Sequence, residues 1–110
     1  NLTPDRSTVG ASLGLQTNNI IPKNSLVILD DHDFTSFLFY SNQKKVYTIE
    51  DDIESPQTEW WKVKRANLEE FTKSSKNVWI VTPNPNNLPI KIEEGQIKSV
   101  YNGYSFASLE

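Results

Sequence analysis

The chain contains no cysteine, only one histidine and four glycines, and no long apolar run. Without cysteine, neither a disulfide nor a thiolate metal site can form. Four scattered glycines are too few for a phosphate-binding loop of the GxGxxG or Walker type. No apolar run approaches the roughly 18 residues that a membrane-spanning helix needs. These absences exclude a disulfide scaffold, a thiolate-held zinc site and a P-loop nucleotide site.

Positive charge is also scarce, because 11 lysines and arginines face 14 acidic residues and leave a net charge of −3. A protein that binds nucleic acid needs a basic face to neutralise phosphates. The lysines at 44, 45, 62, 64, 73 and 76 are instead spread among acidic residues, as on a solvated surface. We therefore expect no nucleic-acid partner.

The length and the two ends of the chain bear on its organisation. A chain of 110 residues suits one domain, which we expect to span residues 1–110. The chain begins with Asn1 rather than methionine, and it ends in Leu109-Glu110, which a common restriction-site junction leaves behind. We expect an excised soluble fragment of a larger membrane protein, with residues 109–110 from a cloning junction.

Helix and strand signals alternate along the sequence. Four apolar residues at 26–29 predict a strand that is covered on both faces, and we expect it to be central and the most buried. Asn102-Gly103 between two strand-like runs predicts a hairpin, because both turn residues need a positive φ. The pattern predicts helices over 4–18, 34–40 and 68–74, and strands over 26–29, 46–49, 78–81, 97–101 and 104–109.

These elements predict an α/β fold. A strand, a short helix and a second strand within residues 26–49 indicate a right-handed parallel crossover. Crossovers on opposite sides of the first strand give a small open sheet whose parallel strands follow the order 2-1-3. We expect flanking helices and a C-terminal antiparallel hairpin beside that sheet.

Two short motifs have structural interpretations. Asn67 and Glu70 resemble a capping box at the start of the helix over 68–74. Gly10 and Gly14 form a GxxxG motif, which promotes association of apolar membrane helices. The segment around these glycines is polar, so we interpret them as ordinary packing positions.

An acidic cluster, Asp30-Asp31-His32-Asp33, directly follows the first predicted strand. Open α/β sheets bind ligands at the carboxyl ends of their strands. Asp30, Asp31 and His32 are therefore candidate ligand-facing residues. In the structural interpretation, Asp33 caps the following helix by accepting a hydrogen bond from the backbone of Thr35 or Ser36, and the other acids are solvated.

The same cluster has a metal interpretation. Hard divalent cations prefer carboxylate oxygens, and His32 could add a nitrogen ligand. Four adjacent residues cannot all converge on one ion, so distant ligands are needed. Asp51, Asp52 and Glu54 could supply them, although nothing in the spacing requires it.

A third interpretation is phosphoryl chemistry. Residues 31–35, DHDFT, match the D-x-D-x-T pattern and resemble haloacid-dehalogenase-like phosphatases, which implies an aspartate nucleophile and a role for Asp31 and Asp33. That family also needs a later lysine and an acidic pair after another strand. Here the strand over 78–81 is followed by Thr82 and Pro83, with no acid. A receiver domain would likewise need an acid where Thr82 stands.

We predict no catalytic residue, no metal ligand and no cofactor.

Aromatic residues offer a further kind of site. Tyr40, Trp60 and Trp61 are candidate ligand-facing residues, because aromatic side chains can line a carbohydrate or peptide surface. In a chain of this size, aromatic residues more often belong to the core. A stand-alone binding or interaction module that uses Trp60-Trp61 and the acidic loop over 50–57 is therefore an alternative function.

The order of the elements carries a family resemblance. The sequence has IPKNS at 21–25 before the first strand, FYSNQKKV at 39–46, LEEF at 68–71 and VWIVT at 78–82. In this order the chain resembles the extracytoplasmic C-terminal domain of polytopic, lipid-linked-sugar glycosyltransferases. These are the dolichyl-phosphate-mannose-protein mannosyltransferase and aminoarabinose-transferase-like group. The resemblance covers most of residues 21–82.

The resemblance implies an accessory, non-catalytic domain on the extracytoplasmic face of the cell membrane. In the family, the catalytic acids lie in loops between membrane helices, so none of them maps onto this chain. The implied parent protein transfers a sugar from a polyprenyl-phosphate donor. The implied partners are the membrane-embedded remainder of the same polypeptide and a lipid-linked sugar or acceptor.

Overall fold

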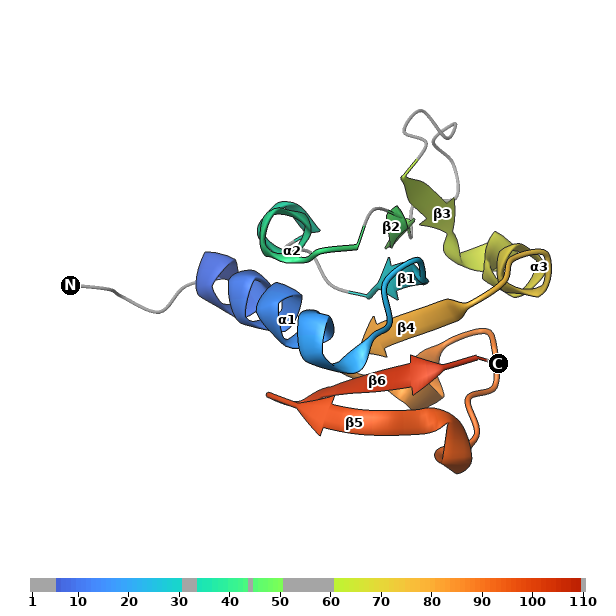
Figure 1. Ribbon diagram of the computed structural model, residues 1–110. Coiled ribbons are helices and arrows are strands. Elements are labelled where there is room, and N and C mark those ends of the chain that lie inside the picture. Colours follow the sequence, from blue (N-terminus) through green and yellow to red (C-terminus); the bar gives the residue numbers. More distant parts are fainter. Residues whose placement is uncertain (1–5, 31–33, 44, 51–60, 110) are drawn as a thin grey trace.

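The computed structural model describes residues 6–30, 34–43, 45–50 and 61–109. Its centre is a six-stranded sheet in the order β3-β2-β1-β4-β6-β5, with helices on both faces (Figure 1). The α-helices are α1 (Arg6–Ile20), α2 (Phe34–Tyr40) and α3 (Leu68–Lys73), and the 3-10 helices are η1 (Arg65–Asn67), η2 (Pro85–Asn87) and η3 (Glu94–Gln96). The strands are β1 (Leu26–Leu29), β2 (Lys45–Glu50), β3 (Lys62–Lys64), β4 (Val78–Thr82), β5 (Ile97–Tyr101) and β6 (Tyr104–Ser108).

The parallel part of the sheet confirms the predicted order. Strand β1 lies between β2 and β4 and is parallel to both, with Ile28 opposite Tyr47 on one side and Ile80 on the other. Helix α2 connects β1 to β2, and α3 precedes β4. The α/β class, the flanking helices and the antiparallel C-terminal hairpin are confirmed as well.

Two apolar layers enclose the sheet, because successive side chains of a strand point to opposite faces. Val27 and Leu29 of β1 join the layer under α1 and α2, whereas Ile28 joins the layer under α3. The first layer contains Leu13, Ile21, Val27, Leu29, Phe37, Val46, Trp79, Val81 and Phe106. The second contains Ile28, Val63, Leu68, Val78, Ile80 and Ala107.

The most buried strand is β4 rather than β1, so this expectation was wrong. All five residues of β4 are buried, whereas Leu26 at the start of β1 is only half-buried. Both strands have a paired neighbour on each side, so the difference lies in how the faces are covered: every side chain of β4 is covered, whereas that of Leu26 is covered only in part. Ile28, at the middle of β1, is fully buried as expected.

Strand β3 was not predicted from the sequence. Its three residues alternate lysine, valine and lysine, and only Val63 is buried. It lies at the edge of the sheet and pairs in parallel with the end of β2. Short edge strands with lysine are common, since they limit pairing with other chains, and they give a weak sequence signal.

The C-terminal hairpin forms at the predicted turn. Asn102 and Gly103 have φ angles of 55° and 82°, and Tyr101 pairs with Tyr104 across the turn. Two central residues with positive φ match the right-handed twist of the flanking strands. The hairpin closes onto the sheet because β6 pairs with β4 in antiparallel fashion.

Helices α1 and α2 cross in close contact at Gly14. A Cβ atom on Gly14 would lie 2.6 Å from the backbone oxygen of Phe37, so only glycine permits this approach. Asn18 then joins the two helices, since its side chain donates to the Tyr40 oxygen at 3.3 Å and accepts from the Asn42 amide at 2.8 Å. In the described part of the chain, no helix is long and apolar enough to span a membrane.

The capping box predicted at Asn67 and Glu70 was wrong. Asn67 precedes α3, but its side chain forms no capping hydrogen bond. The reason is η1, which runs directly into α3 and leaves Asn67 with φ −100° and ψ 4° instead of the extended backbone of a helix cap. A capping box is found instead at η3, where the Glu93 amide donates to Oε1 of Gln96 at 2.7 Å.

Candidate functional site at the carboxyl edge of the sheet

The carboxyl ends of β1 and β4 lie side by side at the point where the order of the parallel strands reverses. Because these strands pair in register, Asp30 directly after β1 comes next to Thr82 at the end of β4. The Asp30 amide continues the ladder by donating to the Val81 oxygen at 2.8 Å. Ligands of open α/β sheets bind at such a reversal, so this edge is where a site is expected.

Thr82 forms a hydrogen bond with one carboxylate oxygen of Asp30. Its side-chain hydroxyl donates to Oδ2 of Asp30 at 2.7 Å and accepts from the Asn84 amide at 3.0 Å. Thr82 is fully buried, whereas the Asp30 side chain keeps 22% of its surface exposed. A hydrogen bond from a fixed hydroxyl orients the carboxylate, and the turn after β4 fixes that hydroxyl in its place.

Arg65 faces the other oxygen of Asp30. Its Nη2 atom lies 3.8 Å from Oδ1 of Asp30, and Nη1 donates to the Asn87 oxygen at 3.5 Å. The Arg65 side chain is 32% exposed, so water weakens this ion pair. Arg65 thereby connects η1, the end of β1 and η2 at one edge of the sheet.

This arrangement indicates a structural role for Asp30. Each oxygen of its carboxylate faces a donor from the fold, so the carboxylate is held in one orientation by its neighbours. A neighbouring guanidinium also repels a divalent cation. Among the described residues, no group of three or more His, Cys, Asp or Glu side chains could hold a metal ion.

The other predicted site residues do not gather around Asp30. Asp31, His32, Asp33 and Trp60 lie outside the described residues, as do the possible distant metal ligands Asp51, Asp52 and Glu54. Tyr40 ends α2 and therefore lies toward the amino ends of the parallel strands, where 43% of its surface is exposed. Trp61 directly precedes β3 and is half-buried, with its backbone oxygen accepting from the Thr48 amide.

Sequence reasoning missed Thr82 and Arg65 as partners of Asp30. The signal for Thr82 was present, since the order 2-1-3 places the end of the strand over 78–81 beside Asp30. No comparable signal pointed to Arg65, because its position depends on β3, which the pattern did not predict.

The chain was compared with known protein families, with curated proteins and with solved structures, and none of them matches it. Function must therefore be argued from the fold and from the contacts of individual side chains.

Proposed function

We propose that this chain is an accessory, non-catalytic extracytoplasmic domain of a membrane glycosyltransferase that uses a polyprenyl-phosphate sugar donor. The observation that carries the non-catalytic part is the engagement of Asp30 by Thr82 and Arg65. The acid best placed for chemistry is thus committed to the fold. The glycosyltransferase part rests on the resemblance in element order over residues 21–82.

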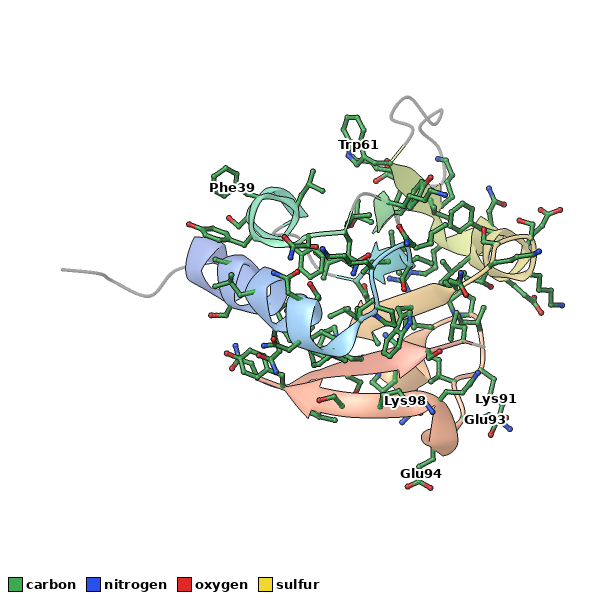
Figure 2. All side chains as sticks on the ribbon, viewed as in Figure 1. Phe39, Trp61, Lys91, Glu93, Glu94 and Lys98 are labelled. Carbon is green, nitrogen blue, oxygen red and sulfur yellow. The ribbon has the colours of Figure 1, made fainter. Side chains whose placement is uncertain are left out.

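An exposed apolar face on α1 and α2 supports a role beside another structure. Phe39 is 79% exposed and packs edge-on against Tyr40, with ring centroids 5.0 Å apart. Leu15 of α1 and Leu38 of α2 are 53% and 41% exposed. Figure 2 shows Phe39 pointing outward from α2, away from the sheet. Helices α1 and α2 pack against each other, and exposed apolar groups on neighbouring elements can mark an interaction surface. The proposed partner is the membrane-embedded remainder of the same polypeptide.

The complete reading frame that encodes this chain tests the proposal most directly. We expect several apolar segments of about 20 residues each in the encoded protein, each able to span a membrane as a helix. A reading frame without such segments would overturn the proposal.

Activity of the complete protein tests the non-catalytic role. Glycosyl transfer in membranes should persist at a reduced level when Phe39→Ser weakens docking of the domain, and should be unchanged in Lys98→Ser, in the edge strand β5. Complete loss in an Asp30→Asn variant whose melting temperature is unchanged would instead make Asp30 catalytic.

Phosphatase activity is the competing chemistry. We expect the chain to release no phosphate from p-nitrophenyl phosphate in the presence of Mg²⁺. Turnover that disappears in Asp31→Asn would favour the haloacid-dehalogenase-like alternative over the accessory domain.

A further inference from the structure

A cavity of about 430 Å³ lies between α3 and the strands β2 and β3. Figure 1 shows α3 beside β3, on the opposite side of the sheet from α1 and α2. The volume of this cavity lies toward the lower end of the range for ligand-binding cavities, about 300–1,000 Å³. The lining side chains are Tyr47, Lys62, Val63, Lys64, Asn67, Glu70, Phe71 and Ser74.

The apolar part of the cavity is aromatic. The rings of Tyr47 and Phe71 meet edge to face, with centroids 5.1 Å apart and an interplanar angle of 62°. Both residues are half-buried, and Val63 beside them is buried. The aromatic pair is therefore held by the core while part of its surface remains accessible.

The polar part contains two side chains that the fold does not use. Asn67 and Glu70 are exposed, and neither side chain forms a hydrogen bond or an ion pair with any residue that the structure describes. Their position at the start of a helix would ordinarily commit them to capping. Here Asn67 is the last residue of η1 and has φ −100° and ψ 4° instead of the extended backbone of a cap, so the carboxamide and the carboxylate remain available beside the aromatic pair.

This combination selects among ligand classes. A phosphate would meet Glu70 as well as the lysines, and a purely apolar ligand would gain nothing from Asn67 and Glu70. A sugar ring has an apolar C–H face that can lie on an aromatic ring, and hydroxyls that can donate to a carboxylate and exchange hydrogen bonds with a carboxamide. Lys62 and Lys64 line the β3 side of the cavity.

We propose that the cavity between α3 and β3 binds a saccharide, with Tyr47 and Phe71 contacting the ring and Asn67 and Glu70 hydrogen-bonding the hydroxyls. The proposal rests on the proposed function for its biological setting, whereas the ligand class is argued from the cavity alone. Sugar binding by this chain and membrane spans in its reading frame are separate observations, so either can fail without the other.

Saturation-transfer-difference NMR on the chain tests the proposal with named probes. D-mannose, D-glucose and N-acetyl-D-glucosamine are each titrated, and sorbitol is the control because it carries similar hydroxyls without a ring. We expect saturation transfer to the ring protons of at least one sugar and none to sorbitol. No transfer to any of the three sugars, or equal transfer to sorbitol, would overturn the proposal.

Variants locate the binding. Glu70→Gln and Asn67→Ala should each raise the dissociation constant about tenfold, as loss of a hydrogen bond to a bound ligand does. Phe71→Leu keeps an apolar side chain but removes the aromatic ring, and it should abolish saturation transfer to the protons of the sugar ring. Glu69→Gln on the same helix is the matched control and should leave the dissociation constant unchanged, because Glu69 does not line this cavity.

The folded state of each variant is checked by its melting temperature. A folded Glu70→Gln variant that binds as tightly as the unchanged chain would contradict the assigned site. An equal loss of affinity in Glu69→Gln would contradict it too, since it would show a nonspecific effect of charge on the helix.

Discussion

Polar side chains are bonded to other parts of the fold at the carboxyl edge of the sheet, but in the cavity beside α3 two of them have no such partner in the described part of the chain. At the edge, Asp30 faces Thr82 and Arg65, and every oxygen of its carboxylate has a donor nearby. In the cavity, Asn67 and Glu70 have no partner among the described residues. The sequence pattern suggested the reverse, with Asp30 free to meet a ligand and Asn67 and Glu70 committed to a helix start.

This contrast shows that the position of a polar residue in an element does not decide its availability. Asp30 stands where α/β sheets bind ligands, yet a residue 52 positions away engages it. Asn67 stands at a helix start, yet the preceding 3-10 turn gives it a backbone conformation unlike that of a cap, and its side chain forms no capping hydrogen bond. Available polar groups are better identified by their missing partners than by their place in the chain.

Both regions depend on the same core, so the largest expected effect comes from Ile28. Ile28→Ala should lower the free energy of unfolding by about 2–5 kcal/mol, because Ile28 is fully buried beneath α3 and its neighbour Leu29 leads into Asp30. Denaturant unfolding measures this loss. Leu26→Ala should cost less, since Leu26 is only half-buried, and a larger loss there than at Ile28 would contradict the described burial.

Thr82 tests whether the edge is held by its hydrogen bonds. Thr82→Val should lower the free energy of unfolding by about 1–3 kcal/mol, because Asp30 and the Asn84 amide each lose a hydrogen-bond partner. Thr82→Ser retains the hydroxyl and is the matched control. Equal melting temperatures for the valine and serine variants would show that the hydroxyl does not stabilise the edge.

Arg65 tests the weaker contact at the same edge. Arg65→Gln should cost about 0.5–1 kcal/mol, because its 3.8 Å ion pair with Asp30 is partly exposed to water. The difference in stability between the unchanged chain and Arg65→Gln should shrink in 1 M NaCl, where charges are screened. Thermal melts at low and high salt measure it, and a difference that is independent of salt would argue against an ionic contribution.

Asn67 and Glu70 should show the smallest effects. Asn67→Ala and Glu70→Gln should each change the free energy of unfolding by no more than about 0.5 kcal/mol, since neither side chain has a partner in the described structure. Denaturant unfolding of each variant is the measurement. A loss near 1 kcal/mol for Asn67→Ala would indicate a working cap and would remove the contrast between the two regions.

The parts of the fold that follow from local pattern were predictable. The apolar run at 26–29 and the Asn102-Gly103 turn each determine their own element, and the order of the parallel strands follows from the crossovers. Strand β3 was not predictable in this way, because only Val63 among its residues is buried.

The candidate sites were less predictable, because they depend on contacts between distant segments. The sequence identified Asp30 as a candidate site residue. Its ion pair with Arg65 could not be predicted, because the position of Arg65 depends on β3, which was not predicted. The cavity beside α3 brings together Tyr47 and Phe71 from separate elements, and the sequence gives no spacing that joins them. The predictions for Asp31, His32, Asp33 and Trp60 concern residues outside the described part of the chain.

The position of β4 has a consequence for the order of folding. Strands β5 and β6 are joined by a two-residue turn, so their pairing closes a very short loop. Strand β4 must instead meet β1 across about 50 residues, and such distant pairings form more slowly. We expect the amides of β5 and β6 to gain protection from exchange before the amides of β4, so the hairpin forms before the central pairing of β1 with β4.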